Sequence, residues 1–384
     1  MASSWVRAAG LAAAGVIAAA AATLSGSASA GALVEPATPG VQVIHTSATE
    51  STVRVGPFFL PPAASDGTPG AGVPIVNQFV PNLPKPCDDC FVTAVAPNLV
   101  DPAGKRADMT TGVMLHHAVI AAPGQEDVTC GRNGVGAIGR RLFASGDERT
   151  PIAMPAGFAY RVDSGPWVGL FELMNMGKTP QVVFFQAVVR HVPASTPDMK
   201  PITPVWLDED NCYTSVYSVP KGKSATPWSW TSTLTGRIVA AGGHVHAGGV
   251  GLTLDNATLH QRICSSRAGY GSGALDGHVT SMSTCSWDSL GALRAGDKLV
   301  MTSIYNSPKA QDDVMGIMLL AVYETDDVNG GTNAPASMRK TPTTKVPGSA
   351  GGGHMNMGGG HDMGGDDGHD MGDGHDMGDG NPPH

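Results

Sequence analysis

The residues of this chain best suited to chemistry are histidines and one methionine in three short segments. They are His116, His117, His244, His246 and Met315. Imidazole nitrogen suits copper and zinc, whereas a thioether is used mainly where Cu(I) must be held. A chain that offers both ligand types points to copper before any other metal.

The local spacing of these residues sets what each pair can do. Alternate residues of a strand share one face, so His244 and His246 can close on one ion. Adjacent strand residues point to opposite faces, so His116 and His117 can bind one ion only at a bulge, a twist or a strand end. The alternatives are surface or hydrogen-bonded histidines, and core packing for Met315.

The C-terminal tail adds further soft ligands. Residues 351–384 repeat Gly-His-Asp-Met-Gly, and they hold seven Asp and no Lys or Arg. Such a segment has too little apolar surface to fold and is predicted to be disordered. Solubilisation does not require its histidines, so we favour copper capture; the candidate ligands are His354, His361, His369 and His375.

Three ordered fragments carry a family resemblance over roughly residues 85–325. Met114–His117, His244–His246 and Asp313–Met315 together resemble the copper type II, ascorbate-dependent monooxygenases. That superfamily includes peptidylglycine α-hydroxylating monooxygenase and dopamine β-monooxygenase. The first two fragments are also similar to the stress-up-regulated nodulin-like family.

The resemblance implies a fold and a mechanism. It implies two antiparallel sandwiches, each of eight or nine strands, facing each other across a solvent-filled cleft. One copper would use His116 and His117 and accept electrons from an ascorbate-like reductant. The catalytic copper, held by His244, His246 and Met315, would bind dioxygen and abstract hydrogen from a substrate.

The chain departs from that pattern at one ligand. The family completes its first copper site with a third His, but the matching segment, residues 167–176, contains none. Depending on the anchor used, Leu173 or Glu172 occupies that position. Met174 is a possible soft replacement, and His191 is a more distant one. The sequence therefore predicts an altered first site.

Composition and turn residues predict that the chain is an exported, all-β protein with several segments. Short β-branched runs separated by Gly, Pro, Asn and Asp predict two antiparallel, jelly-roll-like β-sandwiches. An Ala-rich apolar run before Ser-Ala-Ser-Ala is typical of an export signal, which predicts a secreted, extracellular protein. The predicted segments are a signal peptide (1–30), a flexible leader (31–75), two sandwiches (76–195 and 196–326) and a disordered tail (327–384).

The cysteines of an exported chain indicate disulfides. All six could pair in fifteen ways, and Cys264 with Cys285 is the favoured pair because both flank one loop. Cys87 and Cys90 could form half of a zinc site, but no second Cys-x-x-Cys completes it.

Charge and motifs narrow the possible functions. The formal charge is −9, of which the tail supplies −7. The body therefore has no basic face for nucleic acid, and no membrane association is expected after signal removal. We predict a copper monooxygenase acting on a small organic or peptide substrate. Alternatives are a copper-buffering protein, a stress-related protein with a vestigial site, and a zinc hydrolase using His116, His117 and His244.

Overall fold

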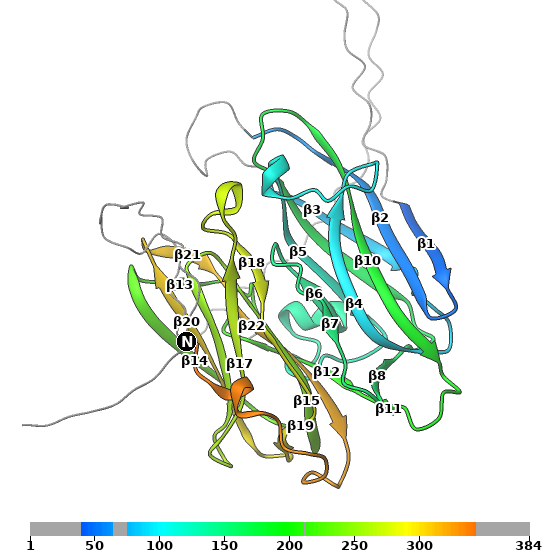
Figure 1. Cartoon of the computed structure of the whole chain (residues 1–384), viewed down its shortest axis with the longest axis vertical. Coiled ribbons are helices and arrows are strands. Elements are labelled where there is room, and N and C mark those ends of the chain that lie inside the picture. Colours follow the sequence, from blue (N-terminus) through cyan, green and yellow to red (C-terminus); the bar gives the residue numbers. More distant parts are fainter. Residues whose placement is uncertain (1–39, 64–74, 211, 343–384) are drawn as a thin grey trace, which may run out of the picture.

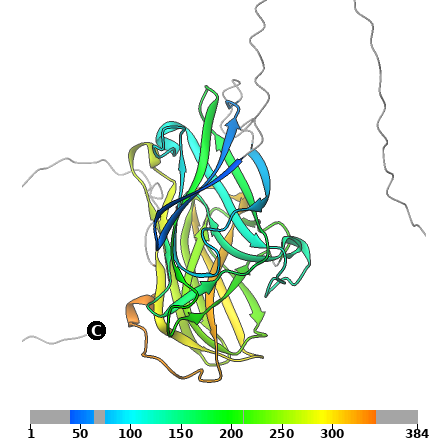
Figure 2. The ribbon, with the colours of Figure 1, turned by 90° about the vertical axis from the view of Figure 1, so that its right-hand side faces the viewer.

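A computed structural model describes residues 40–63, 75–210 and 212–342 of the chain. Over these residues the protein is built from β-strands and four short 3-10 helices, which confirms the predicted all-β class. The strands form two sandwiches that lie side by side (Figure 1, Figure 2). The 3-10 helices are η1 (Met109–Thr111), η2 (Gly134–Ile138), η3 (Gly273–Leu275) and η4 (Ala336–Arg339).

The N-terminal sandwich pairs a seven-stranded sheet with a four-stranded sheet. The larger sheet has the order β1-β2-β10-β4-β8-β11, with β7 beside β4, and the smaller has the order β3-β9-β5-β6. All pairs are antiparallel except β11 with β8. The strands are β1 (Gly40–Ser47), β2 (Glu50–Leu60), β3 (Ile75–Leu83), β4 (Cys90–Val100), β5 (Val113–Ala122), β6 (Arg140–Ser145), β7 (Ile152–Ala153), β8 (Phe158–Arg161), β9 (Trp167–Asn175), β10 (Gln181–Pro193) and β11 (Lys200–Pro201).

The C-terminal sandwich pairs the sheet β12-β22-β15-β19 with the sheet β14-β20-β16-β17-β18, and a small ribbon of β13 and β21 lies beside them. The strands are β12 (Thr203–Asp208), β13 (Tyr217–Val219), β14 (Gly222–Thr231), β15 (Gly236–Val245), β16 (Gly249–Asn256), β17 (Gln261–Tyr270), β18 (Val279–Met282), β19 (Thr284–Leu293), β20 (Lys298–Ser307), β21 (Gln311–Val314) and β22 (Gly316–Glu324).

Each sandwich has its own apolar core, formed by the alternate residues of facing sheets. In the N-terminal core the ring of Phe171 on β9 lies 5.4 Å from that of Phe58 and 5.1 Å from that of Phe185, so it packs against both β2 and β10. In the C-terminal core, Leu252 and Leu254 of β16 are fully buried within one apolar cluster.

Two predictions about the ends of the body are wrong. The expected leader, residues 31–75, contains β1 and β2, and Val55 and Leu60 of β2 are fully buried. The Val-x-Val alternation of β2 gives it an apolar face that β10 and the core require. In the expected tail, Val328 and Ala334 are buried. Residues 343–384, which include the tail histidines, lie outside the described residues, as does the signal peptide.

All six cysteines form disulfides. Cys264 pairs with Cys285, as predicted, and Cys87 pairs with Cys90 rather than forming part of a zinc site. Cys130 pairs with Cys212 and joins the two sandwiches covalently. Among the described residues, no helix is both long enough and apolar enough to cross a membrane.

The two sandwiches contact each other through apolar side chains. One cluster is built around Phe158, Ile202 and Val239, and a second around Trp206, Met315 and Ile317, with Val119 and Ala144 against it. The faces that meet therefore belong to β5 and β6 on one side and to β12, β15 and β22 on the other. The candidate ligands lie on these same strands.

Candidate metal centre

A β-bulge directs both His116 and His117 to the same side of β5. Leu115 pairs with Leu173 of β9 and His117 pairs with Glu172, so the register shifts between Leu115 and His117 and leaves His116 as the extra residue. Leu115 and Ala118 are fully buried, whereas the two histidines between them are only partly buried. The bulge that the adjacent histidines require is thus present.

His244 and His246 lie at the end of β15, in the other sandwich. His244 pairs with Ile317 of β22, and His246 follows the last residue of the strand. The glycine before them is sterically required, because a Cβ on Gly243 would lie 2.4 Å from a methyl carbon of Leu252. The small residues flanking the His-x-His segment therefore allow β15 to pack closely on β16.

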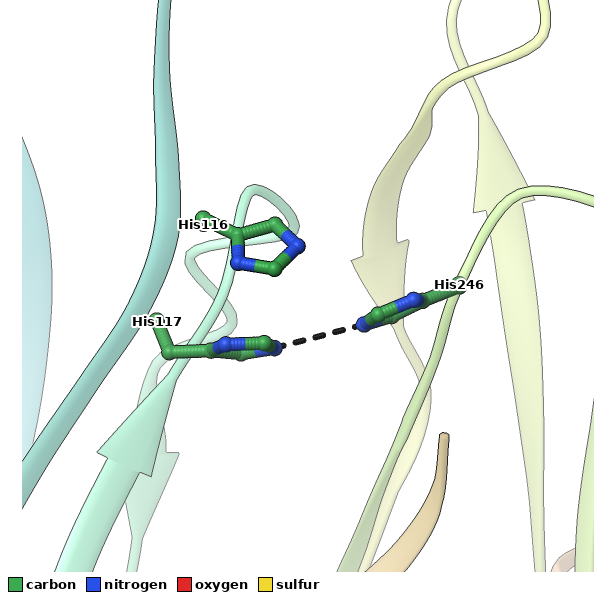
Figure 3. Close-up of side chains that lie close together, drawn as sticks. All are labelled: His116, His117 and His246. Atoms are coloured by element: carbon green, nitrogen blue, oxygen red, sulfur yellow. Dashed lines mark hydrogen bonds between the residues drawn. The ribbon is translucent and has the colours of Figure 1, made fainter. Parts of the chain in front are cut away.

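The four histidines meet at the interface between the sandwiches. The ligating nitrogens of His116, His117 and His246 all lie within 4.8 Å of one another. The Nε2 atoms of His117 and His246 are 3.3 Å apart, and the two rings, whose planes are 20° apart, meet edge to edge (Figure 3). The His244 ring centroid lies 5.3 Å from those of both His117 and His246.

In each of these four rings, Nδ1 lies within hydrogen-bonding distance of an oxygen acceptor. Oxygen Oε2 of Glu172 lies 3.2 Å from Nδ1 of His116 and 2.7 Å from Nδ1 of His117. Nδ1 of His246 donates to the carbonyl of Asp313 at 2.8 Å. Nδ1 of His244 lies 3.2 Å from Oε2 of Glu148. In the neutral tautomer that these acceptors select, all four rings present an unprotonated Nε2.

This arrangement leaves nitrogen lone pairs facing each other. With both Nδ1 atoms donating, neither Nε2 of His117 nor that of His246 carries a proton to share, although the two atoms are 3.3 Å apart. Nε2 of His244 is buried and has no hydrogen-bond partner among the described residues. A cation placed between these atoms would remove the repulsion and satisfy the lone pairs.

Protonation does not relieve the repulsion at ordinary pH. Burial lowers the pKa of His117 to about 4, and burial followed by the neighbouring histidines lowers the pKa of His246 well below its usual value. Hydrogen bonds from His116 and His117 hold the pKa of Glu172 far below that of a free carboxyl. Neutral imidazoles beside an ionised carboxylate are the protonation states that a metal site needs.

The donor set fits a copper ion. Metal–nitrogen bonds of about 2.0 Å at tetrahedral angles require nitrogens about 3.3 Å apart, which is the separation of the two Nε2 atoms. A carboxylate or carbonyl accepting from the far nitrogen of each ring is the usual support of a metal-bound histidine. Three imidazoles suit copper or zinc equally well, so the thioether is the discriminating ligand.

Met315 lies at the same place. It joins β21 to β22, is 8% exposed, and lines one cavity together with His117 and His244. Its main chain is tied to the histidine segment through Tyr305: the amide of His246 donates to the Tyr305 hydroxyl, which donates to the carbonyl of Met315 at 2.6 Å. Met315 therefore lines the same cavity as two of the histidines.

The geometry differs from the implied pair of separate copper sites. His116 and His117 do not form a centre of their own across a solvent-filled cleft, because the sandwiches are packed together and His246 reaches His117. The position of the missing third histidine is filled by Glu172, which contacts both rings, while Leu173 is buried in the core.

The structure places the two more distant candidates on β9 and β10. Met174 lies two residues beyond Glu172 on β9 and pairs with Met114. His191 is on the other sheet, where its Nε2 lies 2.9 Å from the hydroxyl of Ser51. The sequence also did not reveal Glu148 and Gly146. Gly146 leaves room for His244, since a Cβ there would lie 2.6 Å from Cε1 of that ring.

Comparison with known proteins adds independent support for the resemblance. Residues 208–325 match the family model described as Stress up-regulated Nod 19. The chain is also similar to "Probable copper-dependent oxygenase M1" of a Phoma species, with 27% identity over 303 residues, 72% of each chain. It is 28% identical over 255 residues to "Probable copper-dependent oxygenase clz3" of Cochliobolus lunatus, which covers 59% of this chain and 77% of that one.

These matches confirm the similarity to the stress-up-regulated nodulin-like family and link the chain to copper-dependent oxygenases. The family match covers the sandwich that carries His244, His246 and Met315. The match to the first relative extends over more than that sandwich, since it covers 303 residues.

Proposed function

We propose that this protein is an exported copper-dependent oxygenase that hydroxylates a C–H bond of an organic substrate, using dioxygen and an external reductant such as ascorbate. One copper centre forms between the sandwiches, with His116, His117 and His246 as its nitrogen ligands. His244 and Met315 complete its surroundings. The observation that carries this proposal is the convergence of imidazole nitrogens from both sandwiches.

Copper, when bound, supplies the one-electron chemistry that the side chains themselves lack. Glu172 orients His116 and His117 by accepting from both Nδ1 atoms. Glu148 orients His244 in the same way, and its pKa is lowered because the interaction with His244 and two backbone amides outweigh burial, which raises it. These carboxylates keep the ring nitrogens that face the cavity free to bind.

The remaining residues shape the surroundings of the centre. Met315, Trp206 and Ile317 form an apolar wall, which would keep bulk water from the site while leaving room for a substrate. The Met315 thioether favours the Cu(I) form, which is the form that reacts with dioxygen. The three disulfides support export, because such bonds persist in oxidising compartments.

The first test counts and identifies the copper ligands in full-length protein. A background variant with alanine at His354, His361, His369, His375 and His384 removes tail histidines from the count. In it, copper EPR should report one site with several nitrogen ligands. His246→Ala and His117→Ala should each remove that signal, and His260→Ala, a histidine outside the cluster, should not. Retention of the signal in both cluster variants would exclude the proposed centre.

The second test asks for turnover. Copper-loaded protein should consume dioxygen with ascorbate in a substrate-dependent manner across a panel of apolar organic compounds and peptides, and Met315→Ala should lower the rate. Copper binding without any reductant-dependent oxygen uptake would instead favour the copper-buffering alternative.

A further inference from the structure

The cavity beside the histidines has mainly apolar walls, and a buried arginine that keeps an unpartnered donor lines it. The cavity has a volume of about 370 Å³ and is bordered by residues of both sandwiches. Its apolar walls include Val119, Ala144, Ile317 and Leu319. The donor is Arg141 of β6, whose side chain is only 2% exposed.

A second register shift brings Arg141 to this cavity. Val119 of β5 pairs with Ala144 and Ala121 pairs with Arg141, with the shift between Ile120 and Ala121. The extra residue places Arg141 on the same face of β6 as Ala144, toward the other sandwich. There its guanidinium lies over the ring of Trp206, 4.6 Å from the centroid.

The charge of Arg141 is already balanced, but its hydrogen-bonding capacity is not exhausted. Nε and Nη2 donate to the two carboxylate oxygens of Asp127 at 2.8 and 2.9 Å. Nη1 is buried and has no partner among the described residues. A buried donor is costly to leave unpaired, so a ligand oxygen at this point would bind favourably.

The backbone positions of Arg141 and of the histidines are separated along the strands. Arg141 pairs with Ala121, four residues beyond His117 on β5, which corresponds to about 13 Å along a strand. The opposite wall follows the same direction, with Met315, Ile317 and Leu319 as alternate residues at the start of β22. The histidines and Arg141 therefore border the cavity at different places.

We propose that this cavity binds a neutral, mainly apolar organic molecule whose oxygen acceptor is held by Nη1 of Arg141, with its reacting carbon beside the histidines. As the substrate class of the centre, this inference rests on the proposed function. A carboxylate is disfavoured because Asp127 already neutralises the charge of Arg141. An ammonium group is disfavoured because it has no acceptor to offer to Nη1 of Arg141.

The test uses three probes of equal chain length: nonan-2-one, nonanoate and nonylammonium. Calorimetry on the metal-free, full-length protein should show that nonan-2-one binds, with the two charged probes weaker by about tenfold or more. Ala144→Phe, which fills the cavity, should lower the affinity for the ketone at least as much. Ala153→Phe adds the same ring on the exposed β7 and should bind as the wild type.

A second variant tests the role of Arg141. Arg141→Lys keeps a charge beside Asp127 but lacks Nη1, so the ketone should bind about tenfold more weakly while circular dichroism stays unchanged. If this variant does not fold, the three probes and the comparison of Ala144→Phe with Ala153→Phe still test the proposed ligand class. Equal affinity for nonanoate, unchanged binding in Ala144→Phe, or no ketone binding to the wild type would each overturn the proposal.

The outcome is separable from that of the copper experiments, because the metal-free protein is titrated. Ketone binding in a protein that fails to bind copper would leave the ligand class standing and remove the oxygenase. Copper binding without ketone binding would leave the copper centre standing and remove the proposed ligand class.

Discussion

Substitution of Gly146 by alanine should displace His244 without disturbing the backbone. A Cβ at this position would lie 2.6 Å from Cε1 of His244 and 2.6 Å from Oε2 of Glu148, about 0.8 Å short of the 3.4 Å at which ordinary contact begins. Gly146 does not have a left-handed φ, so the effect is steric. Overpacking of this kind costs about 1–3 kcal/mol. The displaced ring should also weaken copper binding roughly tenfold or more, as loss of an orienting partner does.

Two measurements check this prediction: the urea midpoint of the metal-free protein and the copper dissociation constant. Gly124→Ala is the matched control, because no atom lies within 4 Å of a Cβ at that exposed glycine. Its stability should change by no more than about 0.5 kcal/mol. If Gly146→Ala matched the control in both stability and copper affinity, the tight packing of His244 against the N-terminal sandwich would be refuted.

Three further predictions follow from the same contacts. Glu172→Gln should weaken copper binding about 10- to 100-fold, because a neutral amide supports the two Nδ1 donors less well; titration should find no such change in Glu50→Gln. Replacing both Cys130 and Cys212 with alanine should lower the free energy of unfolding by about 4 kcal/mol, since this bond closes a loop with a sequence separation of 82; an unchanged urea midpoint would contradict that. Burial raises the pKa of Glu209 to about 8 despite hydrogen bonds from Ser303, so its contribution to stability is complete below its unfolded pKa and is lost as the pH rises toward 8. Glu209→Gln should lack this loss of roughly 1.4 kcal/mol per pH unit, which unfolding at pH 5.5 and pH 8 would detect.

The fold class was accessible from sequence because it depends on local pattern. Alternating apolar residues and turn residues predict strands. The segment rich in β-branched residues that we predicted to be a strand is β10 in the structure. The same reasoning failed for residues 40–60, where Pro, Gly and Ser nearby suggested a flexible leader. What makes β2 a strand is its pairing with β10 and burial against Phe171, both of which are contacts with residues far along the chain.

The ligand residues were also accessible, but their orientation was not. Softness of the donors indicated copper, and the adjacency of His116 and His117 indicated a bulge, which β5 contains. Glu172 was recognised only as one of two residues, with Leu173, that could occupy the position of the missing ligand. Its role as acceptor for both rings depends on the pairing of His117 with Glu172 across β5 and β9, which a one-residue change in register would abolish.

By itself the sequence determined the chemistry available: imidazoles, one thioether, paired cysteines and an all-β body. Only the tertiary structure decided that His117 and His246, 129 residues apart, present their Nε2 atoms to each other. Strand pattern is a property of neighbouring residues, whereas this meeting depends on how two separately cored sandwiches dock. That docking is set by Trp206, Met315 and Ile317 and by the bond between Cys130 and Cys212. For this reason, the histidines of two copper sites predicted as separate lie in one cluster.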